Sequence, residues 1–234
     1  MSLAVARRRR DVVTATGALA VAALCSRVVA SGRVAPAERA VFGVVNGWPD
    51  AWRPALWSVQ LVGVLGMPLL AAVPAALLRR WRLVVALAAL VPLKLVVEHG
   101  VLKALVHRER PGTTIPGAVL RGVPAADPAF PSGHAVIAFG VVVLVAPHLR
   151  RRWQVVVLAL AVLNGVARVY LGGHAPLDVV AGAAVGVALG SVLRLVCGED
   201  ATVTAVRSPR RPRHPRAVRR AAPTSTATSR SRSG

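Results

Sequence analysis

Residues 81–102 read WRLVVALAALVPLKLVVEHGVL, an apolar run long enough to cross the hydrocarbon core of a bilayer, which takes about 20 helical residues. Lys94 and Glu98 interrupt this run four positions apart, so that their side chains share one helix face. Lys103 follows Lys94 by nine positions, which puts the two lysines on roughly opposite sides of a straight α-helix. We therefore expect Lys94 and Glu98 to form an internal ion pair with a structural role, facing other parts of the protein.

Five further apolar runs accompany this one along the chain. They cover residues 12–31, 55–78, 134–149, 153–169 and 176–196. Of the 234 residues, 55% are hydrophobic and only 17% are charged, whereas soluble domains carry about a quarter charged residues. Backbone polar groups in lipid must be satisfied within the segment, so each run is expected to be helical. The sequence predicts an all-α polytopic membrane protein, a bundle of six transmembrane helices.

The arginines between these runs predict the orientation of the bundle. They cluster at residues 7–10, at 79, 80 and 82, at 150–152, and after the sixth run. If all six runs cross the membrane, these clusters fall on one side, and the positive-inside rule makes that side the cytoplasm. We expect a multi-pass protein of the plasma membrane with both termini in the cytoplasm. The first run is interpreted as an uncleaved span, because its apolar core is long for a signal peptide.

Composition divides the chain into three parts. Residues 1–11 form a basic cytoplasmic N-terminus, 12–200 the six-helix membrane domain, and 201–234 a tail rich in Arg, Pro and Ser that we expect to be disordered. A polybasic tail attracts anionic lipid. Nucleic acid is not an expected partner, because no folded nucleic-acid-binding motif accompanies the basic residues. Residues 34–53, with tryptophans 48 and 52, are predicted to lie at the membrane interface or to re-enter it.

Polar residues gather in three groups at the predicted outer ends of the helices. The groups are Lys103 with Arg110-Pro111, then Pro131-Ser132-Gly133-His134, and then Arg168 with His174 and Asp178. An ionisable residue at the mouth of a membrane span is costly and indicates a functional site. The arginine clusters that set the topology do not include these residues, so their shared side is an independent indication of one site.

The first two groups and Arg168 suit a phosphate site. Arg110 and Arg168 supply planar forks that bind phosphate oxygens bidentately, and Lys103 supplies a point charge. A helix that begins after Ser132 and Gly133 offers unpaired backbone N–H groups and a positive dipole end to an anion. Ser132 is expected either to cap this helix or to hydrogen-bond a phosphate oxygen. Since Pro111 favours extended geometry at Arg110, the helix that carries Lys103 should end nearby.

Two histidines add the means for covalent chemistry. His174 and Asp178 are four residues apart, and a carboxylate one turn away can orient an imidazole and stabilise its cationic form. His134, on another run, can hold a proton. The combination predicts phosphoryl transfer with a phosphohistidine intermediate, in which His174 attacks phosphorus and His134 protonates the leaving oxygen.

Together, the three groups resemble the signature motifs of the type 2 phosphatidic acid phosphatases, a superfamily shared with vanadium haloperoxidases and bacterial class A acid phosphatases. The resemblance covers about residues 103–182. It implies a helical core like that of the acid phosphatases and haloperoxidases, and activity without metal or cofactor. It also implies His174 as nucleophile, Asp178 as its partner and His134 as general acid. The family's third motif usually has Ser immediately before its Arg, where this chain has Ala167.

The function predicted from these residues is hydrolysis of a lipid phosphate or diphosphate. The resemblance implies substrates such as phosphatidic acid, phosphatidylglycerol phosphate or polyprenyl diphosphate, and the outward loop 112–130 is expected to help select among them. Two alternatives stay open: a lipid phosphotransferase with the same intermediate, and a non-catalytic lipid-anion binder or transporter. A metal site made of His134, His174 and Asp178 is disfavoured, because three nearby cations would repel a divalent ion.

Overall fold

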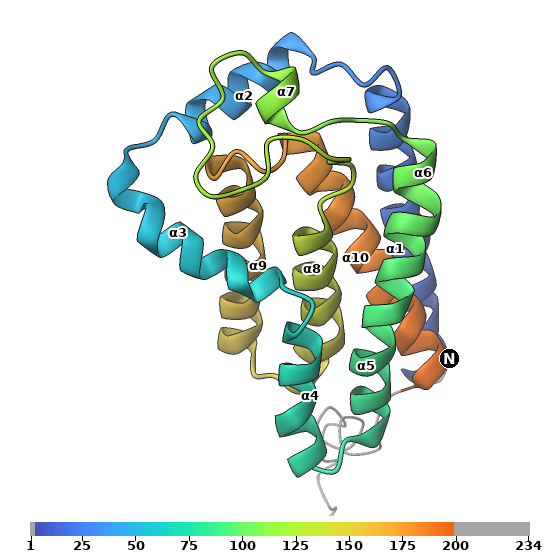
Figure 1. The fold of residues 1–234 in the computed structure, drawn as a ribbon. Coiled ribbons are helices and arrows are strands. Elements are labelled where there is room, and N and C mark those ends of the chain that lie inside the picture. The colour runs from blue at the N-terminus through green and yellow to red at the C-terminus, as the bar shows by residue number, and fades with distance from the viewer. Residues whose placement is uncertain (1–2, 199–234) are drawn as a thin grey trace, which may run out of the picture.

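The computed structural model describes residues 3–198, and its regular elements are helices, with one isolated β-bridge between Glu109 and Pro128 (Figure 1). The prediction of an all-α membrane protein is confirmed for this part of the chain. The predicted tail at 201–234 lies outside the described residues.

Four helices are long and apolar enough to cross a membrane within the described part of the chain. They are Val5–Val29 in α1 (Leu3–Val29), Trp81–Leu105, α9 (Arg151–Tyr170) and α10 (Pro176–Cys197). The run Trp81–Leu105 consists of α5 (Trp81–Leu95), η3 (Val96–Leu102) and α6 (Lys103–Leu105). Helix α8 (Gly133–Val145), continued by η4 (Ala146–His148), is shorter. The count of six spans is therefore not confirmed, since length and composition support four, or five with a bent pair.

The apolar run 55–78, predicted to be one span, is broken in the structure. It contains most of α3 (Arg53–Gln60), which follows η1 (Asp50–Trp52), then η2 (Leu61–Gly63) and α4 (Met67–Leu77), with a bend of 64° between the two halves. The break lies against the start of α8. A Cβ added at Gly63 would lie 2.6 Å from the backbone oxygen of His134 and 2.9 Å from the Asn164 side chain. A glycine is therefore needed where the broken segment meets α8.

The start of the chain also differs from the prediction. Helix α1 begins at Leu3, whereas the first helical run was predicted to begin at residue 12. Residues 3–11 are rich in Ala and Arg, which are strong helix formers, so the basic segment continues the membrane helix as an extra two turns or so.

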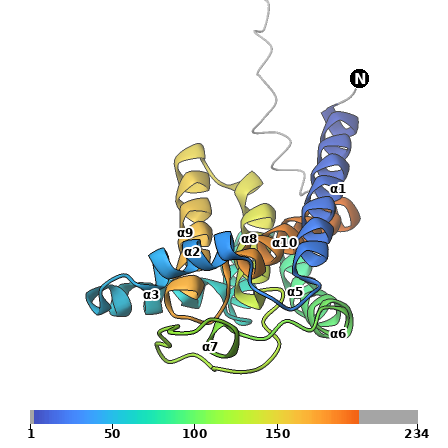
Figure 2. The same cartoon turned by 90° about the horizontal axis from the view of Figure 1, so that it is seen from above.

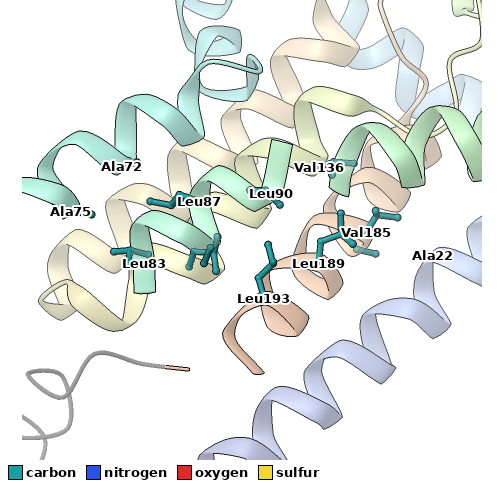
Figure 3. Packing of buried hydrophobic residues seen from close by; sticks show 13 residues of the cluster. Ala22, Ala72, Ala75, Leu83, Leu87, Leu90, Val136, Val185, Leu189 and Leu193 are labelled. Carbon is teal, nitrogen blue, oxygen red and sulfur yellow. The ribbon is translucent and has the colours of Figure 1, made fainter. Parts of the chain in front are cut away.

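Helix α10 lies at the centre of the bundle and packs against α1, α5 and α8. Their main shared cluster includes the leucines shown in Figure 3. Small residues let α8 and α10 approach closely: a Cβ added at Gly186 would lie 3.0 Å from the backbone nitrogen of Gly140, and one at Gly190 would lie 3.0 Å from the oxygen of Gly140. Such small-residue contacts are typical of packing between membrane helices.

The two ends of the bundle differ in character. At one end, Asp11 of α1 pairs with Arg194 of α10 at 3.3 Å. The turn from α4 to α5 lies at the same end (Figure 1). At the opposite end, α2 (Pro36–Asn46) lies across the ends of α9 and α10, beside the loop that contains α7 (Pro111–Thr114) (Figures 1 and 2). The segment predicted to be interfacial or re-entrant thus forms a short helix across this second end.

We predict that Gly63→Ala lowers the melting temperature of the detergent-purified protein, because the added methyl group overlaps the backbone of His134. Overpacking of this kind costs about 1–3 kcal/mol. The matched control is Gly66→Ala in the same break, where an added Cβ meets nothing within 4 Å. Equal melting temperatures for the two variants would show that the contact between Gly63 and His134 is not tight.

Candidate active site

A pocket of 290 Å³ lies where the break after α3 meets η3, the start of α8 and the turn between α9 and α10. Six of the eight predicted site residues line it: Lys103, Arg110, Gly133, His134, Arg168 and His174. The other lining residues are Gly63, Val64, Leu65, Lys94, Glu98 and His99. The three polar groups of the sequence are therefore brought together around one cavity, and both imidazoles face it.

The remaining two predicted residues, Ser132 and Asp178, lie behind the pocket. Both are fully buried, and the backbone N–H of Ser132 donates to the backbone oxygen of Asp178 at 2.9 Å. The Ser132 hydroxyl makes no capping hydrogen bond to α8 and finds no partner among residues 3–198. The capping role suggested for this hydroxyl is therefore wrong, and contact with phosphate stays a prediction.

The two arginines of the pocket are fixed through their terminal nitrogens. Arg110 donates from Nη1 to the backbone oxygen of Gly173 at 2.9 Å, and Arg168 donates from Nη1 to the side-chain oxygen of Gln60. A Cβ added at Gly173 would lie 2.6 Å from Nη2 of Arg168, so this glycine gives the guanidinium room. The Nε atoms of both arginines are buried and have no acceptor among residues 3–198, which leaves donors for an anion.

The lysines of the pocket correct one prediction. The ion pair of Lys94 with Glu98 is present at 2.5 Å, but Lys103 also pairs with Glu98, at 2.7 Å, and all three residues line the pocket. The expectation that Lys94 faces away is therefore wrong. The reason is η3, a π-helix in which each hydrogen-bonded turn holds one residue more than an α-turn, so Lys94 and Lys103 come to the same side.

The end of this helix agrees with the sequence. Helix α6 ends at Leu105, and Arg110 has the extended backbone expected before Pro111, with φ −69° and ψ 158°. The chain leaves the bundle here and brings Arg110 back over the pocket from a loop.

His174 lies in the turn between α9 and α10, which Gly172 closes with a φ of +80°. Its Nδ1 lies 3.8 Å from Oδ2 of Asp178, too far for a hydrogen bond, and this oxygen accepts from the backbone N–H of Ala175 at 2.9 Å. Burial, together with the nearby cations of Arg168, Arg110 and Lys103, holds the pKa of His174 well below 6.5. The imidazole is therefore neutral in the free protein, the form in which a ring nitrogen can attack.

Arg108 forms a buried ion-pair network behind the histidine. Its side chain is fully buried and donates to Oδ1 of Asp178 at 2.9 Å and to Oε2 of Glu38 at 2.5 Å. Oε1 of Glu38 accepts from the backbone N–H of Leu177 at 2.9 Å. Helix α2 is thereby connected to the start of α10, next to His174.

Sequence reasoning missed three residues that shape this site: Gln60, Arg108 and Glu38. Each had a signal. Gln60 is a polar residue in an otherwise apolar run, and Glu38 is one of only nine acidic residues in a chain of 30 Lys and Arg. Arg108 is two positions before Arg110, so the first motif contains two arginines, of which one faces the pocket and the other faces the carboxylates.

Two further predictions concern Ala167 and loop 112–130. Ala167 is fully buried in an apolar cluster with Leu56, Tyr170 and Leu171 and does not line the pocket. No residue of loop 112–130 lines the pocket either, so its selective role stays a prediction. Among residues 3–198, no group of three His, Cys, Asp or Glu side chains is placed to hold a metal ion.

We predict that Arg108→Met destabilises the protein by about 3–5 kcal/mol, because it leaves two buried carboxylates without their counter-ion. Thermal unfolding in detergent measures the change. The double variant Arg108→Met with Glu38→Gln should lose less than the sum of the two single variants, since the partners are coupled. Arg39→Met, an exposed arginine of the same helix as Glu38, is the control and should stay within about 0.5 kcal/mol of the unchanged protein. Additive losses would argue against the network.

Comparison with curated proteins finds two partial relatives. The chain is 33% identical over 135 residues to a lipid A 4′-phosphatase of Bacteroides thetaiotaomicron, covering 53% of this chain and 60% of the relative. It is 44% identical over 62 residues to the bacitracin transport permease protein BcrC of Bacillus licheniformis, covering 26% of this chain and 30% of the relative. The matches thus span less than two thirds of either relative's length.

Two solved structures share the fold. One is Aquifex aeolicus LpxE, with a TM-score of 0.58 and 23% identity over 65% of this chain and 92% of that one. The other is a transmembrane PAP2-type phosphatidylglycerolphosphate phosphatase from Bacillus subtilis, with a TM-score of 0.63 and 19% identity over 77% of this chain and 94% of that one. Residues 79–199, which contain all three motifs, match the PAP2 superfamily. The chain therefore belongs to the PAP2 superfamily.

Proposed function

We propose that this protein is a membrane phosphatase that hydrolyses a lipid phosphate or diphosphate. The observation that carries the proposal is the convergence of two histidines, two arginines and a lysine from three distant segments on one pocket. Membership of the PAP2 superfamily supports it. One relative is named a lipid A 4′-phosphatase, one solved structure with the same fold is a phosphatidylglycerolphosphate phosphatase, and LpxE shares that fold too.

The proposed reaction has two displacements at phosphorus. In the first, Nε2 of His174 forms a bond to phosphorus while the bond to the lipid oxygen breaks, and His134 gives its proton to that oxygen. In the second, His134 takes a proton from water, whose oxygen bonds to phosphorus as the bond to His174 breaks. Orthophosphate and neutral His174 result. Lys103, the arginines and the backbone of Gly133 would stabilise charge on the equatorial oxygens.

Asp178 has a supporting part in this scheme. The phosphohistidine carries a positive imidazole ring, which a carboxylate behind Nδ1 would stabilise. The buried group of Glu38, Arg108 and Asp178 has one more negative than positive charge, so it favours a cation at His174 once substrate binds. The present separation of 3.8 Å needs to shorten by about 1 Å for a hydrogen bond. Such tightening in the substrate complex is common at catalytic sites.

A lipid substrate is supported by the surroundings of the pocket. The pocket is partly lined by the apolar residues Val64 and Leu65, and two of the helices that line it, Trp81–Leu105 and α9, are candidate membrane spans. A phosphate in the pocket would therefore sit at the end of the apolar bundle, where headgroups lie. We further propose that this end faces outward and that the arginine clusters face the cytoplasm.

A non-catalytic or transport function is the second candidate, because one relative is named a transport permease. The same assay distinguishes the candidates. Purified protein in detergent is given a lipid phosphate. Chelator-insensitive release of orthophosphate supports hydrolysis, transfer of phosphate to a second lipid supports a phosphotransferase, and binding without turnover supports a binder or transporter.

We predict that His174→Ala reduces orthophosphate release by at least about a thousandfold, because the nucleophile is removed. Thermal unfolding should show that the variant is folded. His107→Ala, an exposed histidine outside the pocket, is the control and should keep full activity. Near-full activity of the His174 variant would remove the assigned nucleophile.

The proposed orientation predicts which positions a membrane-impermeant thiol reagent reaches in intact cells. Cys25 and Cys197 are first replaced by Ala, and single cysteines are then placed at the exposed positions Ala126 and Arg152. The cysteine at 126 should be labelled and the cysteine at 152 should react only after the cells are opened. The opposite pattern would invert the orientation of the site.

A further inference from the structure

The pocket already contains an anionic group at the place where a phosphate is expected. The carboxylate of Glu98 lies against the start of α8: a Cβ added at Gly133 would meet its Oε2 at 2.6 Å and its Oε1 at 2.9 Å. The side chain of Glu98 is only 4% exposed, although it borders the cavity. A helix N-terminus attracts negative charge, and here a carboxylate of the chain itself lies beside it.

Two lysines compensate this carboxylate, one at each of its oxygens. Lys94 contacts Oε2 at 2.5 Å, and Lys103 contacts Oε1 at 2.7 Å. Lys103 is one of the cations proposed to bind phosphate, whereas Lys94 belongs to no motif. In the free protein the carboxylate therefore pairs with a lysine that the substrate would use, and it lies beside the helix end that the substrate would use.

We propose that Glu98 is a resident anion that competes with phosphate for Lys103 and for the N-terminus of α8, and yields both when phosphate enters. The proposal rests on the proposed function in taking phosphate as the ligand of this pocket. It adds a role for Glu98 and Lys94, which the reaction scheme leaves without one.

The second lysine explains how such an exchange avoids an unpaired buried charge. When Lys103 turns to phosphate, Glu98 stays paired with Lys94, so no carboxylate is left alone in an apolar bundle. When orthophosphate leaves, Glu98 again takes Lys103 and the helix end. Glu98 thus weakens the hold on the product without removing a cation from the site, and it is a positioning residue that acts through Lys103.

The experiment measures binding of inorganic orthophosphate to the full chain in detergent, from the rise in melting temperature with phosphate concentration. Glu98→Gln keeps the shape of the side chain and removes its charge. Because a like charge within a few ångströms of the anion disappears, the phosphate concentration for half-maximal stabilisation should fall by about tenfold or more. A structural role alone would leave it unchanged or raise it.

The matched control is Glu109→Gln, an equal change of charge at an exposed residue outside this pocket, which should not alter phosphate binding. If Glu98→Gln does not fold because Lys94 is left unpaired, the double variant Lys94→Gln with Glu98→Gln removes the pair together. It should still bind orthophosphate several-fold more tightly than the unchanged protein.

Unchanged or weaker binding in these variants, or binding equally improved by Glu109→Gln, would overturn the proposal. Binding does not require hydrolysis, so the two proposals fail separately. A chain that binds phosphate without hydrolysing any lipid phosphate would contradict the phosphatase function alone. A phosphatase whose Glu98→Gln variant binds phosphate no better would contradict the competing anion alone.

Discussion

The buried pairing of Arg108 with Glu38 and Asp178 is the interaction on which the arrangement of the site depends. A guanidinium without access to water must have its charge compensated, and here the two carboxylates come from α2 and α10. The backbone oxygen of Arg108 also accepts from the N–H of Ala129 at 2.7 Å, shortly before α8 begins. One buried charge therefore fixes α2, the loop after α6, the entry to α8 and the start of α10 relative to one another.

The cations at this end of the bundle divide into two kinds. Arg121 uses its side chain fully: Nε pairs with Asp50 at 2.8 Å, and its other nitrogens donate to backbone oxygens, including that of Tyr170. Like Arg108, it holds segments together. Arg110 and Arg168 are anchored by one terminal nitrogen each and keep buried Nε donors without an acceptor among residues 3–198. Pairing with a carboxylate thus marks the structural arginines, Arg108 and Arg121, whereas the two arginines that face the pocket have no carboxylate partner among residues 3–198.

The sequence predicted the helices and the pocket residues because both signals are local. Apolar runs of sufficient length identify membrane helices, and three short motifs identify the site. The errors have a different origin. The break near Gly63 lies within a continuous apolar run, and the residues that it packs against, His134 and Asn164, are far along the chain. The position of Lys94 depends on a π-helix that hydropathy does not reveal. The pairing of Arg108 with Glu38 joins residues 70 positions apart.

The break between α3 and α4 and the π-helix η3 both border the pocket, and their irregular backbone has a physical consequence. Backbone groups freed inside a membrane bundle must find partners within the protein. At the break, the side chain of Asn164 donates to the backbone oxygens of Val59 and Gln60, at 3.3 and 2.9 Å. One helical turn further along α9, Arg168 donates to the side chain of Gln60. On this face of α9, Asn164 thus satisfies backbone oxygens of the break, and the side chain of Gln60 in turn accepts from Arg168, which faces the pocket. The irregular backbone is tolerated beside the pocket because its freed oxygens find a donor within the protein.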